Sequence, residues 1–149
     1  MEDEAAGGPR LAVYDDKSGH TIEHGPAGGN PTIGYGRNLA GRGLLPGEAE
    51  MMLDNDLALN LRKIQDSLPW IATIPPVWCD VIEMIQYNTG DVLGWPHMLS
   101  AMQSGDADGA IAEIASSHAD GELPARYGRL MQAIVARSWD PSTWVPLST

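Results

Sequence analysis

The sequence predicts an α+β fold in which a small, glycine-rich sheet lobe precedes a larger helical lobe. Most of the glycines, together with short runs of alternating apolar and polar residues, lie before Leu45. Beyond Leu45 the apolar residues recur at steps of three and four, which is the spacing of helices. The 149 residues suit one domain, since domains average roughly 150 residues. We therefore expect a single domain with a β lobe over residues 1–45, a helical lobe over residues 46–149, and a cleft between the lobes.

Three short alternating runs predict the sheet. They cover residues 11–14, 20–24 and 32–35. Turn signals separate them, first Lys-Ser-Gly at residues 17–19 and then a glycine- and proline-rich stretch at residues 25–31. This pattern predicts an antiparallel sheet of two or three strands.

Proline residues mark where several helices begin. Pro46 suits the first position of a long helix that ends at Pro69, and its apolar residues form a stripe. The stripe consists of Leu53, Leu57, Leu61, Ile64 and Leu68.

A second helix starts near Pro76 and is apolar over much of its circumference, so it belongs in the middle of a bundle. Its expected stripe consists of Val77, Val81, Met84 and Ile85, with Trp78 and Ile82 beside it. A short helix around residues 97–103 follows the breaks at Gly90 and Gly94. Another is capped by Asp106 or Asp108, and Pro124 opens the last one.

The charge and hydropathy of the chain exclude several classes of protein. Nine Lys and Arg against 20 Asp and Glu give a net charge of −11. Binding to nucleic acid depends on Lys and Arg, so we expect no nucleic-acid partner and no attraction to anionic membranes. No apolar run reaches the length of a spanning helix, and the start of the chain is acidic, unlike a signal peptide. We therefore expect a soluble protein made in a cytoplasm.

The single cysteine and the five tryptophans are expected to be structural. Cys79 alone can form neither an internal disulfide nor a structural zinc site, and it lies in an apolar helical pattern. Because the chain has no Phe, its tryptophans are expected to supply core bulk, although each could instead stack on a sugar ring. They are Trp70, Trp78, Trp95, Trp139 and Trp144.

The sheet region carries a resemblance to a known family. Residues 10–16, Arg-Leu-Ala-Val-Tyr-Asp-Asp, are followed after a turn by Thr-Ile-Gly-Tyr-Gly-Arg-Asn-Leu at residues 32–39 and by Gly43. This ordered set resembles the active-site hairpin of bacteriophage-type lysozymes, the endolysin muramidases. The likeness extends to about Trp139, through a long helix that includes Glu48 and a central apolar helix that ends near Asn88.

The resemblance implies a fold and a chemistry. It implies a lysozyme-like fold that cleaves the β-1,4 bond between N-acetylmuramic acid and N-acetylglucosamine in peptidoglycan, with no cofactor and no metal. Such cleavage needs two carboxyl groups that flank one sugar linkage. By position, Asp16 matches the second carboxylate and Thr32 matches the residue that helps to hold the water. Tyr14, Tyr35 and Asn88 are the residues expected to bind substrate.

The chain departs from the family pattern at the general acid. A gapless alignment places Gly7 where the family has its catalytic Glu. Glu4 is the nearest Glu, and its use requires residues 5–7 to be looped out. Two hypotheses follow: a muramidase with Glu4 as the acid, and a catalytically inactive lysozyme-like protein that binds glycan or has a structural role in a virion or other assembly.

Two further expectations concern the metal content and the site of action. His20, Glu23 and His24 could be metal ligands, but a solvated hairpin tip is the favoured interpretation because no compact ligand set is evident. We expect a monomer that reaches the periplasm and cell wall from the host cytoplasm through a holin-type protein, or that is carried in a virion.

Overall fold

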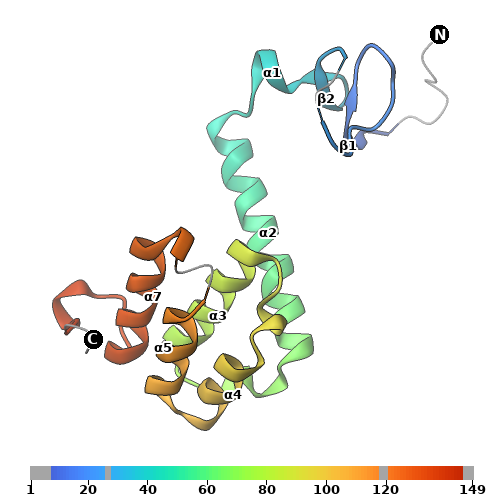
Figure 1. Ribbon diagram of the computed structural model, residues 1–149. Coiled ribbons are helices and arrows are strands. Elements are labelled where there is room, and N and C mark those ends of the chain that lie inside the picture. Colours follow the sequence, from blue (N-terminus) through green and yellow to red (C-terminus); the bar gives the residue numbers. More distant parts are fainter. Residues whose placement is uncertain (1–7, 26–27, 118–120, 146–149) are drawn as a thin grey trace. The chain divides into compact units, whose positions relative to one another are not determined.

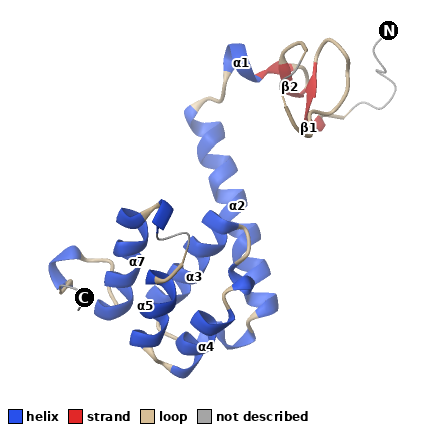
Figure 2. Cartoon of the chain, in the orientation of Figure 1, coloured by secondary structure: helices blue, strands red, loops and turns tan. Residues whose placement is uncertain are grey.

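The computed structural model describes residues 8–25, 28–117 and 121–145. It has the α+β composition that the sequence predicts, with a small antiparallel sheet followed by helices (Figure 2). The chain divides into two compact units, Met1–Met52 and Leu53–Thr149. The division falls inside helix α2, which spans Pro46–Ser67, because the first turns of this helix contact the sheet region.

Three strands form the sheet of the N-terminal unit. They are β1 (Arg10–Asp15), β2 (Pro31–Gly34) and β3 (Arg37–Asn38), in the antiparallel order β1-β2-β3. Tyr14 lies opposite Thr32 in the register of β1 and β2. Gly34 and Gly36 have φ angles of 66° and 85° on either side of Tyr35, so the tight connection from β2 to β3 uses the conformational freedom of glycine.

The segment 20–24 does not form the strand that its alternation predicts. It contributes one bridge, from Thr21 to Tyr14. The chain turns sharply after β1, where the N–H of Gly19 donates to the Asp15 carbonyl at 2.7 Å and the N–H of Asp15 donates to the His20 carbonyl at 2.9 Å. This tight turn brings the segment against the end of β1 for only a few residues, and the third strand is β3 instead.

The described part of the N-terminal unit buries polar rather than apolar side chains. Asp15 is 7% exposed and Thr32 is 3% exposed, and no apolar side chain of the described residues before Leu53 is buried. Several large apolar side chains of this unit are exposed, namely Leu11, Tyr35, Leu44, Leu45, Met51 and Met52. Hydrogen bonds, not an apolar core, therefore organise the sheet region.

Prolines and local caps set the starts of the helices, as the sequence predicts (Figure 1). After α1 (Leu39–Arg42) and α2 come η2 (Pro69–Thr73), α3 (Pro76–Thr89), η3 (Val92–Gly94), α4 (Pro96–Ser104), α5 (Ala107–Ala115), α7 (Pro124–Ala136) and η4 (Pro141–Thr143). Asp106 caps α5 by accepting a hydrogen bond from the N–H of Gly109 at 2.9 Å. No helix within the described residues is both long and apolar enough to cross a membrane.

Helix α3 supplies the centre of the apolar core. Trp78, Val81, Ile82 and Ile85 are fully buried on it. The indole N–H of Trp78 donates to the Ile134 carbonyl of α7 at 3.1 Å, which joins the two helices. The expected stripe was rotated: Met84 is 38% exposed and Val77 is only half-buried, whereas Trp78 and Ile82 face the core.

The sequence predicts packing roles for Cys79 and Trp139, and the structure agrees with this role only for Cys79. Cys79 is half-buried, its thiol donates to the Ile71 carbonyl at 3.1 Å, and burial raises its pKa. A thiol with a raised pKa is a poor nucleophile, which fits a packing role. The expectation of core packing is wrong for Trp139, which is 36% exposed because it lies beyond the last core helix.

Candidate functional site

Asp16 and Thr32 are both bonded to Asn30. Asp16 follows β1, and its carboxylate accepts hydrogen bonds from the backbone N–H of Asn30 at 2.6 Å and from the Asn30 side-chain amide at 2.9 Å. The Thr32 hydroxyl donates to the Asn30 carbonyl at 3.1 Å. The N–H of Asp16 donates to the same carbonyl at 3.1 Å. The two residues expected to act on the sugar linkage are thus held by one intervening residue.

The bonds from Asn30 fix the charge of Asp16. The side-chain amide of Asn30, followed by its backbone N–H, lowers the pKa of Asp16, while desolvation and the neighbouring Asp15 oppose the shift. Asp16 is exposed and remains ionised near neutral pH. A carboxylate of this kind can stabilise a developing positive charge or activate a water molecule, but it cannot donate a proton.

Asp15 has a different role from its neighbour. One oxygen of its buried carboxylate accepts hydrogen bonds from the backbone N–H groups of Lys17 and Ser18, at 2.8 and 3.1 Å. The other oxygen accepts from Gly28 and Gly29, at 2.6 and 3.0 Å. The bond from Gly29 is the main cause that lowers the pKa of Asp15, so this carboxyl is also ionised and is unsuited to act as a general acid.

Gly29 lies where the two aspartates converge. A Cβ atom at this position would lie 2.3 Å from Asp16 Oδ1 and 2.8 Å from Asp15 Oδ1. Real Cβ atoms do not approach oxygen atoms this closely, so only glycine fits without moving a carboxylate. The pair Gly28-Gly29 therefore allows the backbone to approach Asp15 and Asp16.

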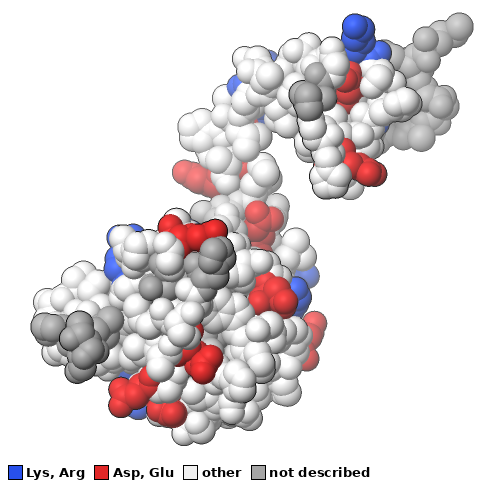
Figure 3. Space-filling model, in the orientation of Figure 1, with Lys and Arg blue, Asp and Glu red and all other residues white. Residues whose placement is uncertain are grey.

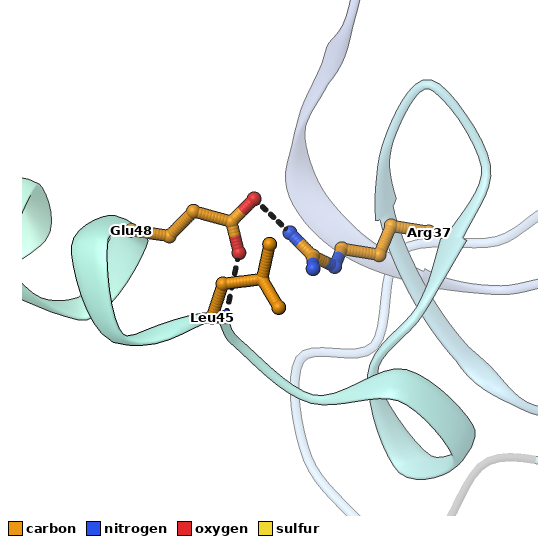
Figure 4. A network of polar contacts seen from close by, with 3 residues as sticks. All are labelled: Arg37, Leu45 and Glu48. Atoms are coloured by element: carbon orange, nitrogen blue, oxygen red, sulfur yellow. Dashed lines mark hydrogen bonds and ion pairs between the residues drawn. The ribbon is translucent and has the colours of Figure 1, made fainter.

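Arg37 and Glu48 connect the sheet to the start of α2 (Figure 4). Glu48 forms an ion pair with Arg37 through one oxygen and accepts the N–H of Leu45 at 2.8 Å through the other. The hydrogen bond from Arg37 lowers the pKa of Glu48. Both Glu48 oxygens are engaged, so this carboxylate supports the helix start rather than serving as a proton donor.

The three residues expected to bind substrate lie in both units. Tyr14 is half-buried on β1, and the guanidinium of Arg10 lies 3.7 Å from the centroid of its ring. Tyr35 is 82% exposed at the turn between β2 and β3. Asn88 belongs to the helical unit, near the end of α3, where its side-chain oxygen accepts a hydrogen bond from Arg126.

Two of the expected site residues lie outside the described part of the chain. A metal site in the hairpin is not supported. Glu4 and Gly7 fall in the segment before residue 8, outside the described residues. His20, Glu23 and His24 are described, and no group of three potential metal-ligating side chains occurs in the described part of the chain.

Asp15 and Asn30 are the residues of the site that the sequence did not point to. A strand-ending Asp followed by Asp-Lys-Ser-Gly is a signal for an Asx turn, so the bonds to Lys17 and Ser18 could have been anticipated. The bonds to Gly28 and Gly29 depend on tertiary structure, because these residues are 13 and 14 positions away.

Two comparisons with known proteins found no match. No protein-family model matches this chain, and a search of curated proteins found no match. The chemistry of the described residues is therefore the basis on which a function can be proposed.

Proposed function

We propose that this chain is a lysozyme-type muramidase that hydrolyses the β-1,4 bond between N-acetylmuramic acid and N-acetylglucosamine in bacterial peptidoglycan. In this proposal Asp16 is the second carboxylate, Thr32 positions the water, and Glu4 is the general acid. The hydrogen bonds that join Asp16 and Thr32 to Asn30 support it most directly, because they hold an ionised carboxylate and a hydroxyl, from two neighbouring strands, to the same residue.

The charge states of the neighbouring acids narrow the choice of proton donor. Asp15 accepts four backbone hydrogen bonds and Glu48 is paired with Arg37, so neither suits the role of a carboxylic acid that delivers a proton. A general acid needs a raised pKa, whereas both of these pKa values are lowered. We therefore keep Glu4, the Glu nearest to the position of the family's acid, as the proposed proton donor.

A catalytically inactive lysozyme-like protein is the second candidate. Gly7 stands where the resemblance places the catalytic Glu, which favours a protein that binds glycan or takes part in an assembly without cleaving it. On the first hypothesis, the protein acts on the cell wall after holin-type release or delivery in a virion.

One experiment separates the two candidates. The full chain is added to isolated peptidoglycan and to outer-membrane-permeabilised Gram-negative cells, and released muropeptides are identified by mass. Asp16→Asn and Glu4→Gln are each expected to lower the rate by about a hundredfold or more. Asp54→Asn is the control, because Asp54 is an exposed carboxylate on α2 outside the site.

Each outcome has a definite meaning. Release that is lost in Asp16→Asn and kept in Asp54→Asn supports the muramidase. If the unmodified chain releases no muropeptides, the enzyme is excluded and the inactive protein stands. Undiminished activity of Glu4→Gln keeps the enzyme but assigns the acid to another residue.

A further inference from the structure

A hollow on the helical unit combines aromatic walls with positive charge. It has a volume of about 640 Å³ and is formed by α2, α3, α7 and the segment after α7. Tyr87, Trp139 and Trp144 line it together with three aliphatic side chains, and Asn88, Arg126 and Arg129 supply its polar groups. We call it the Trp139 hollow. Its size is in the range of small-molecule sites, which measure about 300–1,000 Å³.

Two aromatic side chains of the hollow are exposed, and hydrogen bonds hold its two indole rings. Tyr87 is 46% exposed and Trp139 is 36% exposed. The indole N–H of Trp139 donates to the Asp80 carboxylate at 2.8 Å, and that of Trp144 donates to the Ser138 carbonyl at 3.0 Å. Because both indole N–H groups are already used within the protein, the two rings offer a ligand their apolar surfaces rather than a donor.

Two basic side chains of this acidic protein line the hollow, and the Asp80 carboxylate is bonded to the indole of Trp139. The helical unit has five basic side chains, Arg62, Lys63, Arg126, Arg129 and Arg137, and two of them line the hollow. Acidic side chains are instead spread over the visible face of the helical unit (Figure 3). Arg126 and Arg129 are three residues apart on α7 and so share one face of the helix.

The two arginines differ in what already binds them. Arg126 donates to the side-chain oxygen of Asn88, which orients its guanidinium beside the hollow. Arg129 is exposed and has no hydrogen-bond or ion-pair partner among the described residues. A planar guanidinium binds a carboxylate through two parallel hydrogen bonds, so Arg129 is suited to recognise an anionic group.

We propose that the Trp139 hollow binds an organic carboxylate with a flat apolar body. The aromatic rings would cover the body of the ligand, and Arg129, with the oriented Arg126 beside it, would bind the carboxylate. This site lies wholly in the helical unit and shares Asn88 with the residues expected to bind the muramidase substrate. Its test measures carboxylate binding directly and does not use muramidase activity.

The test uses 2-naphthoate as the probe and 2-naphthamide as its neutral match. NMR signals of the five tryptophan indole N–H groups report binding of each probe to the full chain. 2-Naphthoate is expected to shift the signals of Trp139 and Trp144 and to leave that of buried Trp78 unchanged. The neutral amide is expected to bind at least about tenfold more weakly, as for the loss of a charge-assisted hydrogen bond.

Variants of the arginines complete the test. Arg129→Gln is expected to weaken 2-naphthoate binding by about tenfold or more, Arg129→Lys to weaken it less, and Arg62→Gln to leave it unchanged. Arg62 lies on α2 and does not line the hollow. Equal binding of 2-naphthoate and 2-naphthamide, equal binding by Arg129→Gln, or no shift of Trp139 and Trp144 at millimolar probe would each overturn the proposal.

A second pair of probes identifies the source of the carboxylate. The tripeptide Gly-Gly-Phe with a free C-terminus is compared with its C-terminal amide. Binding of the free-acid peptide alone assigns the hollow to peptide C-termini. Binding of 2-naphthoate without binding of the peptide assigns it to small free carboxylates, and both results support the carboxylate site.

Discussion

The Asp15 carboxylate accepts a hydrogen bond from the backbone N–H of Gly28 at 2.6 Å, across 13 residues of chain. The same carboxylate also accepts N–H groups from the beginning of this segment, at Lys17 and Ser18. One buried side chain therefore holds both ends of the loop between β1 and β2. Asp16 and Asn30 lie directly beside the anchored residues, so Asp15 positions the residues proposed to act on the sugar.

Asp15→Asn is expected to open this loop while leaving the helical unit folded. An amide has one acceptor oxygen, and its NH₂ group would face two backbone N–H donors that it cannot satisfy. Amide hydrogen exchange at Gly28 and Gly29 is expected to become about tenfold faster or more, with exchange in α3 unchanged. Unchanged exchange at both glycines would show that the carboxylate does not anchor the loop.

Acid pH is expected to release the same loop. The pKa of Asp15 is lowered from its ordinary value of 3.8, so the stabilisation that it provides is fully present above that value. It is lost as the pH falls through the lower pKa of the folded state. NMR signals of Gly28 and Gly29, followed from about pH 5 to pH 2, are expected to show this transition, and Asp15→Asn is expected to lack it.

Asn30→Ala tests how the charge of Asp16 is set. The side-chain amide of Asn30 is the largest cause of the lowered pKa of Asp16, so its removal is expected to raise that pKa toward 3.8. The carboxyl carbon signal of Asp16 is expected to titrate at higher pH, and the acid limb of the muropeptide-release profile to move the same way. Asn55→Ala, at an exposed position of α2, is the control and is expected to move neither.

Gly29→Ala is expected to destabilise the folded sheet region strongly, whereas Gly47→Ala is not. The added Cβ would lie 2.3 Å from Asp16 Oδ1, whereas a Cβ at Gly47 in α2 meets no atom within 4 Å. Overpacking costs about 1–3 kcal/mol, and alanine in a helix is favoured over glycine. Thermal melting and amide exchange of the two variants measure the difference, and equal behaviour would contradict the crowding at Gly29.

Gln86→Leu is expected to destabilise the helical unit. Gln86 is 2% exposed, its amide NH₂ donates to the Gly90 carbonyl at 2.8 Å, and its oxygen accepts the N–H of Val92 at 3.0 Å. Leucine would leave the N–H of Val92 without its partner, at a cost of about 1–3 kcal/mol, and would leave the Gly90 carbonyl with only the Lys63 amine, at 3.3 Å. Urea unfolding measures the loss, and Gln103→Leu, at an exposed position of α4, is the matched control.

The sequence predicted most of the elements, because their signals are local. A proline at the first helical turn marked α2, α3 and α7, and alternation marked β1 and β2. Strand β3 has only two residues, Arg37 and Asn38, which are too few to show alternation. The orientation of α3 was predicted less well, because an apolar pattern around most of a helix does not indicate which side faces its neighbours.

The site could be predicted only in part. The resemblance pointed to Asp16 and Thr32, and the structure joins both to Asn30. The role of Asp15 depends on a backbone approach from Gly28 and Gly29 that no local pattern reveals. Likewise, Tyr87 and Trp139 line the same hollow but lie far apart in the chain, so no local pattern could have grouped them.

Every buried apolar side chain of the described residues lies after Leu53, whereas Asp16 and Thr32 lie before it. Selection for heat resistance and selection for altered chemistry would therefore act on separate stretches of the gene. Mutations that fill or stiffen the interior would accumulate in residues 53–149, and those that retune the carboxylate would accumulate in residues 8–45. Libraries restricted to one stretch could be recombined with the other at a crossover within α2.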